Sequence, residues 1–406
     1  MKKQSNTPEI RFQNYEDKWD IEKLINIFGT IRNAFVGTAT PYYVEEGKFY
    51  LESNNVKNGK INYNSQIFIN DEFYEKQRDK WLKTNDIVMV QSGHVGHTAV
   101  IPEELNNTAA HALIVFTDYK KEVNPHFLNY QFQSNSKRKK LDLISTGNTI
   151  KHILASEMKD FKMDFPTFEE QTAVGSLFRI LDDLLSSYKD NLTNYQSLKA
   201  TMLSKMFPKA GQTVPEIRLD GFEDEWGIKR ADEIFKSVSE KNRASLPVLS
   251  ASQIDGMVLR DEIGIDIKYD EATLNNYKVV KPGQFVIHLR SFQGGFALSK
   301  LEGITSPAYT IIDFIDKVSN LPDFWNSILT SRDFIKRLET VTYGIRDGKS
   351  ISFKDFSSLK FVFPEFKEQQ AVGSYFSNLD NLINSHQEKI SQLETLKKKL
   401  LQDMFI

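Results

Sequence analysis

The sequence predicts an α+β fold in which two similar globular domains, built from short strands and turns, are joined by two long helices. One observation behind this is an internal repeat. Landmark residues of Pro8–Trp19 return in Pro215–Trp226, and those of Phe165–Gln171 return in Phe363–Gln369. The paired tryptophans lie 207 positions apart and the paired glutamines 198, so the second copy is nine residues shorter between its landmarks. We therefore expect two related units in a pseudo-twofold internal repeat.

A heptad pattern behind each Phe-Pro landmark is the second observation. Pro166 and Pro364 disfavour helix just before them, and Thr167 with Glu170 fits a capping box. Spacings of four and three residues then recur in identical steps through two series: Val174, Phe178, Leu181, Leu185, Tyr188, Leu192, Tyr195, Lys199, Met202 and Met206, and Val372, Phe376, Leu379, Ile383, His386, Ile390, Leu393, Lys397, Leu400 and Met404. This period of 3.5 residues is typical of a coiled-coil seam. We predict one long helix over about residues 168–207 and a second one in the repeat.

Each helix would be about 60 Å long at roughly 1.5 Å per residue, too long to bury its seam alone. Its best-matched partner is its own duplicate. The pair then acts either as a stabilising bundle or as a spacer between the domains, and we favour the spacer. The polar seam residues Lys199, Lys397, Tyr188 and His386 indicate where register is set, and His386 is interpreted as structural. The repeat also predicts that Phe405 lies near the segment 8–12, as Phe207 precedes Pro215.

Composition narrows the class of protein. The 406 residues exceed what one core usually supports, and a hydrophobic fraction of 40% with 26% charged residues is ordinary for a globular protein. No apolar run is long enough to cross a bilayer, and Met1–Asn6 does not begin a signal peptide, so we expect a cytoplasmic protein. The absence of cysteine excludes thiol chemistry. A net charge of −2 counts mildly against nucleic-acid binding but allows a local basic surface.

Strand and turn signals fill both domains. Asn58-Gly59 and Asp255-Gly256 are strong turn signals at matching places. Further on, a buried strand at 85–90, matched by 283–288, should run into a glycine-containing loop. Side chains that can read base edges collect near these features: Gln91, Ser92, His94 and His97 in the first domain, and Ser252, Arg290 and Gln293 in the second. The alternative for each of them is an ordinary polar loop residue that contacts only solvent.

A basic helix followed by a polar glycine loop recurs later in each domain. Lys and Arg side chains and loop N–H groups are the usual partners of phosphates. The candidates for such a backbone clamp are Lys137, Arg138, Lys139, Lys140, Thr146 and Asn148 in the first domain, and Tyr343, Arg346 and Lys349 in the second. A solvated, charged helix end is the alternative.

Catalytic motifs are absent from the sequence. It has no phosphate-binding Gly-x-x-x-x-Gly-Lys-Ser/Thr segment and no strand-associated Gly-x-Gly-x-x-Gly. His94 and His97 lack the carboxylate or cysteine partners of a metal site, and isolated Glu157-Met158-Lys159 or Asp266-Ile267-Lys268 triplets do not make a nuclease. We therefore predict no catalytic residue, no metal and no cofactor in this chain.

The order of these parts resembles the specificity subunit of type I restriction-modification systems. The most specific matches are Phe165–Gln171, Phe363–Gln369 and the linker Arg218–Phe222 before Trp226, whereas Arg11–Tyr15 departs from that linker. The resemblance implies two target recognition domains on an antiparallel two-helix spacer, each reading one half of a bipartite, asymmetric site in double-stranded DNA. It implies a non-enzymatic subunit that recruits two modification subunits, with their S-adenosylmethionine-dependent adenine methyltransferase, and through them ATP- and Mg-dependent restriction subunits.

The resemblance divides the chain into four parts. These are a linker with target recognition domain 1 (1–165), a central spacer helix (166–208), a linker with target recognition domain 2 (209–363) and a C-terminal spacer helix (364–406). Two other classes stay open: a two-headed protein-binding adaptor without nucleic acid, favoured by the mildly acidic balance, and a stand-alone nuclease or methyltransferase.

Overall fold

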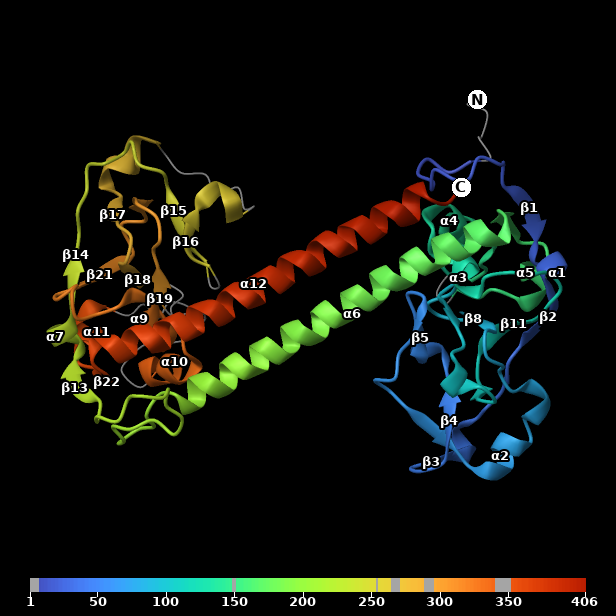
Figure 1. Cartoon of the computed structure of the whole chain (residues 1–406), viewed down its shortest axis with the longest axis horizontal. Coiled ribbons are helices and arrows are strands. Elements are labelled where there is room, and N and C mark those ends of the chain that lie inside the picture. Colours follow the sequence, from blue (N-terminus) through green and yellow to red (C-terminus); the bar gives the residue numbers. More distant parts are fainter. Residues whose placement is uncertain (1–6, 148–150, 253–254, 264–270, 288–295, 340–351) are drawn as a thin grey trace. The chain divides into compact units, whose positions relative to one another are not determined.

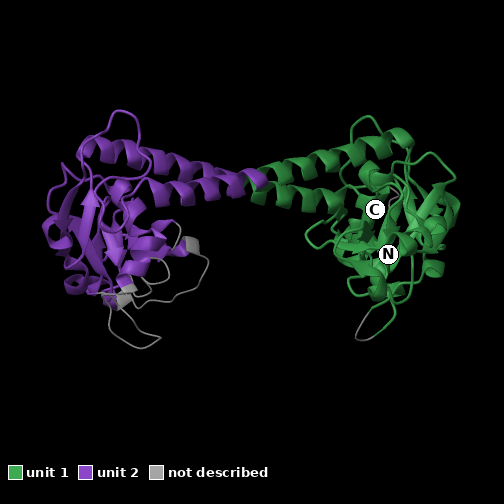
Figure 2. Cartoon of the chain, turned by 90° about the horizontal axis from the view of Figure 1, so that it is seen from below, with its two compact units in different colours: residues 1–189, 388–406 green, residues 190–387 purple. Residues whose placement is uncertain are grey.

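A computed structural model describes residues 7–147, 151–252, 255–263, 271–287, 296–339 and 352–406. The chain divides into two compact units, coloured separately in Figure 2. Unit 1 contains residues 1–189 and 388–406, and unit 2 contains residues 190–387. Unit 1 is therefore completed by the C-terminal residues of the chain, whereas unit 2 is one continuous segment. Among the described residues, no helix is long and apolar enough to cross a membrane.

Unit 1 is built from short strands, short helices and the ends of two long helices (Figure 1). Its strands are β1 (Asp20–Lys23), β2 (Phe28–Asn33), β3 (Tyr43–Val44), β4 (Lys48–Leu51), β5 (Val56–Lys57), β6 (Lys60–Ile61), β7 (Ile67–Ile69), β8 (Ile87–Val90), β9 (Thr98–Val100), β10 (Ala109–Ala110), β11 (Leu113–Tyr119) and β12 (Lys162–Phe165). Its short helices are α1 (Leu24–Ile27), α2 (Asp71–Glu75), α3 (Pro125–Gln133), α4 (Asn135–Ile144) and α5 (Ala155–Met158).

Unit 2 repeats this plan with fewer strands in its described part. Its strands are β13 (Gly227–Arg230), β14 (Phe235–Val238), β15 (Leu249–Ser252), β16 (Gly256–Leu259), β17 (Lys278–Val280), β18 (Phe285–Ile287), β19 (Phe296–Leu298), β20 (Gly303–Thr305), β21 (Thr310–Phe314) and β22 (Lys360–Phe363). Its short helices are α7 (Ala231–Ile234), α9 (Pro322–Leu329), α10 (Arg332–Glu339) and α11 (Phe353–Ser357). The long helices α6 (Phe168–Lys205) and α12 (Phe366–Asp403) contribute residues to both units.

The same central sheet recurs in both units. Its strand order is β2-β11-β8-β9 in unit 1 and β14-β21-β18-β19 in unit 2, with antiparallel pairing between neighbours. A two-stranded ribbon, β1 with β12 or β13 with β22, leads into each long helix. The predicted buried strand is confirmed, because all four residues of β8 are buried. Unit 1 adds a small sheet of order β10-β4-β7-β3.

The repeated sequence landmarks contact each other within each unit. In unit 1 the Arg11 guanidinium donates two hydrogen bonds of 2.7 Å to the buried Glu170 carboxylate, and Trp19 Nε1 donates a third at 3.2 Å. Arg218 and Trp226 make the same contacts to Glu368 in unit 2. The segment that begins at Pro8 or Pro215 supplies the Arg and Trp donors, and the Phe-Pro segment supplies the buried Glu acceptor. The two segments therefore recur together in the sequence because they form one charge network.

The predicted capping box forms only in part. Thr167 Oγ1 accepts a hydrogen bond from the Glu170 N–H at 3.4 Å, as expected for a helix N-cap. The Glu170 carboxylate does not accept a hydrogen bond from the Thr167 N–H, as a full capping box requires, because its oxygens accept from Arg11 and Trp19 instead.

An aromatic cluster closes the core beside each charge network. In unit 1, Phe405 packs on Trp19, Phe127 and Phe178 with ring centroids 5.6 to 6.5 Å apart. The Ile10 N–H also donates to the Asp403 carbonyl at 2.9 Å. The prediction that Phe405 lies near residues 8–12 is therefore confirmed. Phe207 takes the equivalent place in unit 2, where it packs on Trp226, Phe324 and Phe376.

Both predicted long helices are confirmed, and their seam carries polar pairs at equivalent positions. In unit 1, Lys397 Nζ of α12 donates to Asp182 Oδ1 of α6 at 2.6 Å. In unit 2, Lys199 of α6 pairs with Asp380 of α12. Within each unit the beginning of one helix thus lies beside the end of the other, as an antiparallel pairing requires. His386 packs edge-on against Tyr195, which fits its structural interpretation.

Candidate nucleic-acid interface

The first candidate loop, residues 91–97, follows the buried strand β8. Gly93 and Gly96 have φ angles of +81° and +77°, a backbone region that glycine adopts without steric cost. A Cβ on Gly96 would also lie 3.1 Å from Leu141 of α4. The loop therefore turns sharply and approaches α4 closely. His94 is exposed at its tip, whereas Gln91, Ser92 and His97 are partly buried.

The structure brings the two candidate clusters of unit 1 together. Thr146 and His152 exchange two backbone hydrogen bonds of 2.9 and 2.8 Å, which returns the chain after α4 toward the first loop. The Ile153 N–H then donates to the Gln91 carbonyl at 3.0 Å, and Ser92 forms a β-bridge with His152. Residues that are more than 50 positions apart thus share one surface. Lys151 and His152 are exposed there and were not among the predicted residues.

His97 lies where three segments meet. Its Nδ1 accepts a hydrogen bond from the Asn58 N–H at 3.2 Å and lies 3.3 Å from Arg138 Nη2. Burial and, to a smaller extent, the nearby charges of Arg138, His94 and Lys57 lower the pKa of His97 to about 4. The ring is therefore neutral at physiological pH. Because Nδ1 faces two donors, the ring proton resides on Nε2.

The prediction that Lys137 contacts phosphate is wrong. Its side chain is 0% exposed and forms an ion pair of 2.6 Å with the buried Asp164, while Nζ donates to the Lys162 carbonyl at 3.1 Å. Burial lowers the pKa of Lys137 to about 8, against the opposing effect of Asp164. The helical period explains this placement, since Lys137 lies on the same face of α4 as Leu141.

The rest of the basic run has mixed surroundings. Lys139 and Lys140 are exposed at the surface of α4, and Thr146 is exposed in the following loop. Arg138 is half-buried and directs its guanidinium to His97. Exposed lysines of unit 1 are thus Lys139 and Lys140 on α4, together with Lys57 of the hairpin β5–β6, which lies near His97 and which sequence reasoning had not singled out.

Unit 2 can be described only in part at the corresponding places. Ser252 Oγ accepts from the Asp255 N–H at 3.1 Å and stabilises the turn before β16. Arg337 of α10 donates to the Lys360 carbonyl at 2.7 Å, the position equivalent to the Lys162 carbonyl that Lys137 contacts in unit 1. The other predicted residues lie outside the described residues: Asn148 in unit 1, and Arg290, Gln293, Tyr343, Arg346 and Lys349 in unit 2.

The two units share one arrangement of strands and buried contacts, which defines a duplicated architecture. Among the described residues there is no group of three or more His, Asp or Glu side chains that could hold a metal ion. The sequence model of the type I restriction modification DNA specificity domain matches residues 11–217. That match covers about half of the chain and includes all of the candidate surface of unit 1.

Known proteins are similar over almost the whole chain. The putative type I restriction enzyme MjaX specificity subunit of Methanocaldococcus jannaschii is 21% identical, with 98% of this chain and 95% of that protein covered. The MjaVIII specificity subunit of the same organism is 20% identical over the same shares. The crystal structure of a type I restriction-modification S subunit from M. genitalium superposes with a TM-score of 0.64 at 16% identity, and covers 98% of this chain and 99% of that one.

The chain belongs to the family of type I restriction-modification specificity subunits. Members of this family recognise DNA sequence and are not themselves catalytic. The duplicated α+β fold agrees with that of the S subunit from M. genitalium.

Proposed function

We propose that each unit reads one half of a bipartite DNA site and that the long helices set the number of unread base pairs between the halves. The proposal is carried by a contrast between the buried contacts, which repeat in both copies and are called the frame, and the loops, whose sequences differ. The charge network at Glu170 and Glu368 and the seam pairs recur residue for residue. The loop after β8 instead carries His94 and His97, which have no histidine counterparts in the second copy. A repeated frame with different loops suits one scaffold that reads two different sequences.

The proposed interface of unit 1 combines base-reading and phosphate-binding side chains. Gln91, Ser92, His94 and His97 are assigned to base edges, because hydroxyl, amide and imidazole groups can discriminate base pairs there. Lys139 and Lys140, with the loop at Thr146, are assigned to phosphates, which position the protein without reading sequence. Arg138 and Lys137 are left out of this phosphate clamp, because each is committed to an internal partner.

In unit 2 we assign the same task to Ser252 and to Arg290, Gln293, Tyr343, Arg346 and Lys349. Their support is the sequence correspondence with the first copy alone. The division of the chain at residues 165, 208 and 363 into recognition domains and spacer helices is part of the same proposal.

We also propose that the chain works in the cytoplasm, in a complex with two modification subunits and with restriction subunits. The family supports this assembly, in which methyl transfer from S-adenosylmethionine and ATP- and Mg-dependent cleavage belong to the other subunits. The chain itself then needs no cofactor.

The test is selection from a randomised duplex library by the chain in complex with its modification subunits. The expected result is one enriched motif made of two specified blocks with a fixed gap. Enrichment of a single continuous block, or no sequence preference at low salt, would overturn the proposal.

A further inference from the structure

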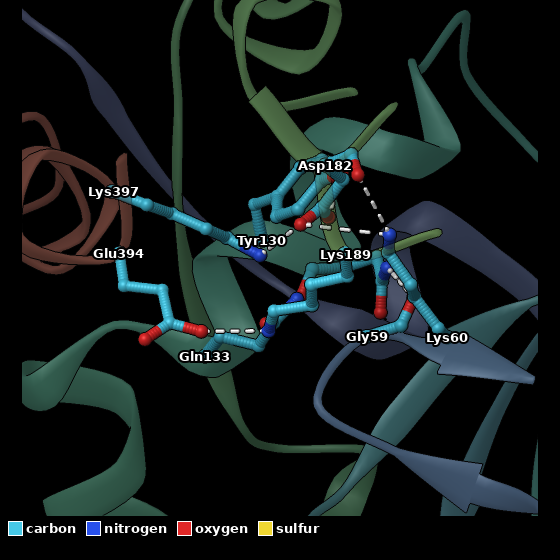
Figure 3. Close-up of polar contacts among 9 residues, drawn as sticks. Gly59, Lys60, Tyr130, Gln133, Asp182, Lys189, Glu394 and Lys397 are labelled. Atoms are coloured by element: carbon cyan, nitrogen blue, oxygen red, sulfur yellow. Dashed lines mark hydrogen bonds and ion pairs between the residues drawn. The ribbon is translucent and has the colours of Figure 1, made fainter. Parts of the chain in front are cut away.

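The turn Asn58–Gly59–Lys60 connects the candidate interface of unit 1 to the long helices. Asn58 and Gly59 have φ angles of +51° and +84°, so the hairpin β5–β6 closes in a tight left-handed turn. Asn129 of α3 donates to the Gly59 carbonyl at 2.9 Å. A Cβ on Gly59 would lie 2.2 Å from Gln133 Nε2, so the turn packs directly on α3 (Figure 3). Glycine adopts this φ angle without steric cost, and a Cβ at residue 59 would displace the end of the Gln133 side chain.

Lys60 joins this turn to the polar pair of the helix seam. Its Nζ donates to the backbone carbonyl of Asp182 at 3.2 Å and lies 3.7 Å from the carboxylate (Figure 3). The Asp182 side chain is buried and accepts from Lys397 at 2.6 Å and from the Tyr130 hydroxyl at 2.8 Å. The base of the hairpin turn is therefore fixed to α3, α6 and α12 together.

The other end of the turn fixes His97. The Asn58 N–H and the Arg138 guanidinium both face Nδ1 of the imidazole ring, at 3.2 and 3.3 Å. The ring can then donate only through Nε2–H. The imidazole ring has no further polar partner among the residues that the structure describes, and it remains partly exposed at the candidate interface.

We propose that His97 determines specificity by donating its Nε2–H to an acceptor on a base edge, and that the turn at residues 58–60 is the positioning element that orients it. This inference rests on the proposed function. In the major groove the available acceptors are purine N7, guanine O6 and thymine O4, whereas cytosine presents only a donor. His97 thus selects against cytosine on the contacted strand. A neutral imidazole is a poorer partner for phosphate than a lysine, which favours a base over the backbone.

The second copy offers a matched comparison for the positioning element. Asp255-Gly256-Met257 stands where the first copy has Asn58-Gly59-Lys60, and Met257 is buried against its own unit. The seam pair Lys199–Asp380 is nevertheless kept. Lys60→Met therefore introduces the residue that the second copy of the repeat has at the corresponding position. Asp380→Asn perturbs an equivalent seam pair in the other unit and serves as the control.

The experiment compares the wild-type chain with His97→Ala and His97→Gln, each in complex with modification subunits, on the same randomised duplex library. His97→Ala should lose discrimination at one position of one half-site by about 5- to 150-fold and leave the other half-site unchanged. His97→Gln keeps a side-chain donor and should retain part of that preference. Unchanged preference at every position would overturn the inference, and so would a uniform loss of affinity, which would identify a phosphate contact. If the wild-type complex selects no bipartite site, the proposed function itself fails.

The orientation of His97 by its neighbours is tested by separate measurements. Wild-type preference at the His97 position should be flat between pH 5.5 and 7.5, because the ring stays neutral. Arg138→Gln removes one of the charges that, with those of His94 and Lys57, lower the His97 pKa. In this variant the His97 pKa followed by NMR should rise, and in Arg138→Lys, which keeps the charge, it should stay low. An unchanged pKa in Arg138→Gln would contradict a contact between Arg138 and the ring. Lys60→Met should weaken the same position alone, and an effect equal to that of Asp380→Asn would contradict the role of the turn.

Discussion

The three lysines in the basic run of α4 should separate into two classes when they are neutralised. Lys139 and Lys140 are exposed, whereas Lys137 is fully buried in an ion pair with Asp164. Each phosphate contact contributes about 0.9 to the slope of log affinity against log salt concentration. Replacing both exposed lysines by glutamine should therefore reduce the slope by about 1.8. Extrapolated from 1 M salt, this is a loss of about 30-fold at 0.15 M, shared by all sequences.

Lys137→Met should leave the salt slope unchanged and lower stability instead. Removing one partner of a buried ion pair leaves an uncompensated charge on Asp164, at a cost of about 3–5 kcal/mol. The double variant Lys137→Met, Asp164→Leu removes both charges and should regain most of that stability. Binding is measured by fluorescence anisotropy on random duplex from 50 to 400 mM salt, and stability by urea unfolding. A slope that falls by about 1 in Lys137→Met, without loss of stability, would refute the reasoning.

Three further outcomes follow from the same contacts. Glu170→Ala should destabilise unit 1 by about 1–3 kcal/mol, because it leaves the buried Trp19 Nε1 and the partly buried Arg11 guanidinium without their acceptor, and Glu368→Ala should do the same in unit 2. Hydrogen exchange should report each loss in its own unit, and equal loss in both units would contradict this. The pKa values of His97 and His126 are each lowered to about 4, mainly by burial, so the unfolded chain binds more protons than the folded chain between pH 6.5 and 4. The free energy of unfolding should therefore fall as pH falls through that window. His97→Asn should lessen this fall when stability is measured by urea unfolding, and an unchanged pH profile would count against a neutral ring. Inserting one heptad into both long helices adds about 10 Å and should lengthen the unread gap by about 3 base pairs in methylation mapping, whereas an unchanged gap would exclude a ruler.

Sequence reasoning succeeded where the signal is periodic or repeated. The heptads predicted α6 and α12, whose bounds at Phe168 and Phe366 follow directly after the Phe-Pro landmarks. The repeat alone predicted that Phe405 would lie beside residues 8–12, because Phe207 has the same place before Pro215. Such patterns are read directly from the order of residues and need no knowledge of tertiary contacts.

The site was predicted less well because its contacts are nonlocal. Lys137 reads like its basic neighbours, yet the spacing Lys137, Leu141, Ile144 follows one helical face and would have indicated burial. The pairing of Arg138 with His97 joins residues 41 positions apart, and the role of Asn58 depends on its backbone N–H alone. No pattern in the sequence marks such contacts, since side-chain chemistry does not report which loops the fold brings together.

Methylation mapping of a strain that carries the modification subunits, with and without this chain, tests the central claim most directly. We expect adenine methylation at one motif with two different specified blocks and a fixed gap, and we expect methylation at this motif to disappear when the chain is absent. Methylation that persists without the chain, or a motif formed by a single continuous block, would contradict the account.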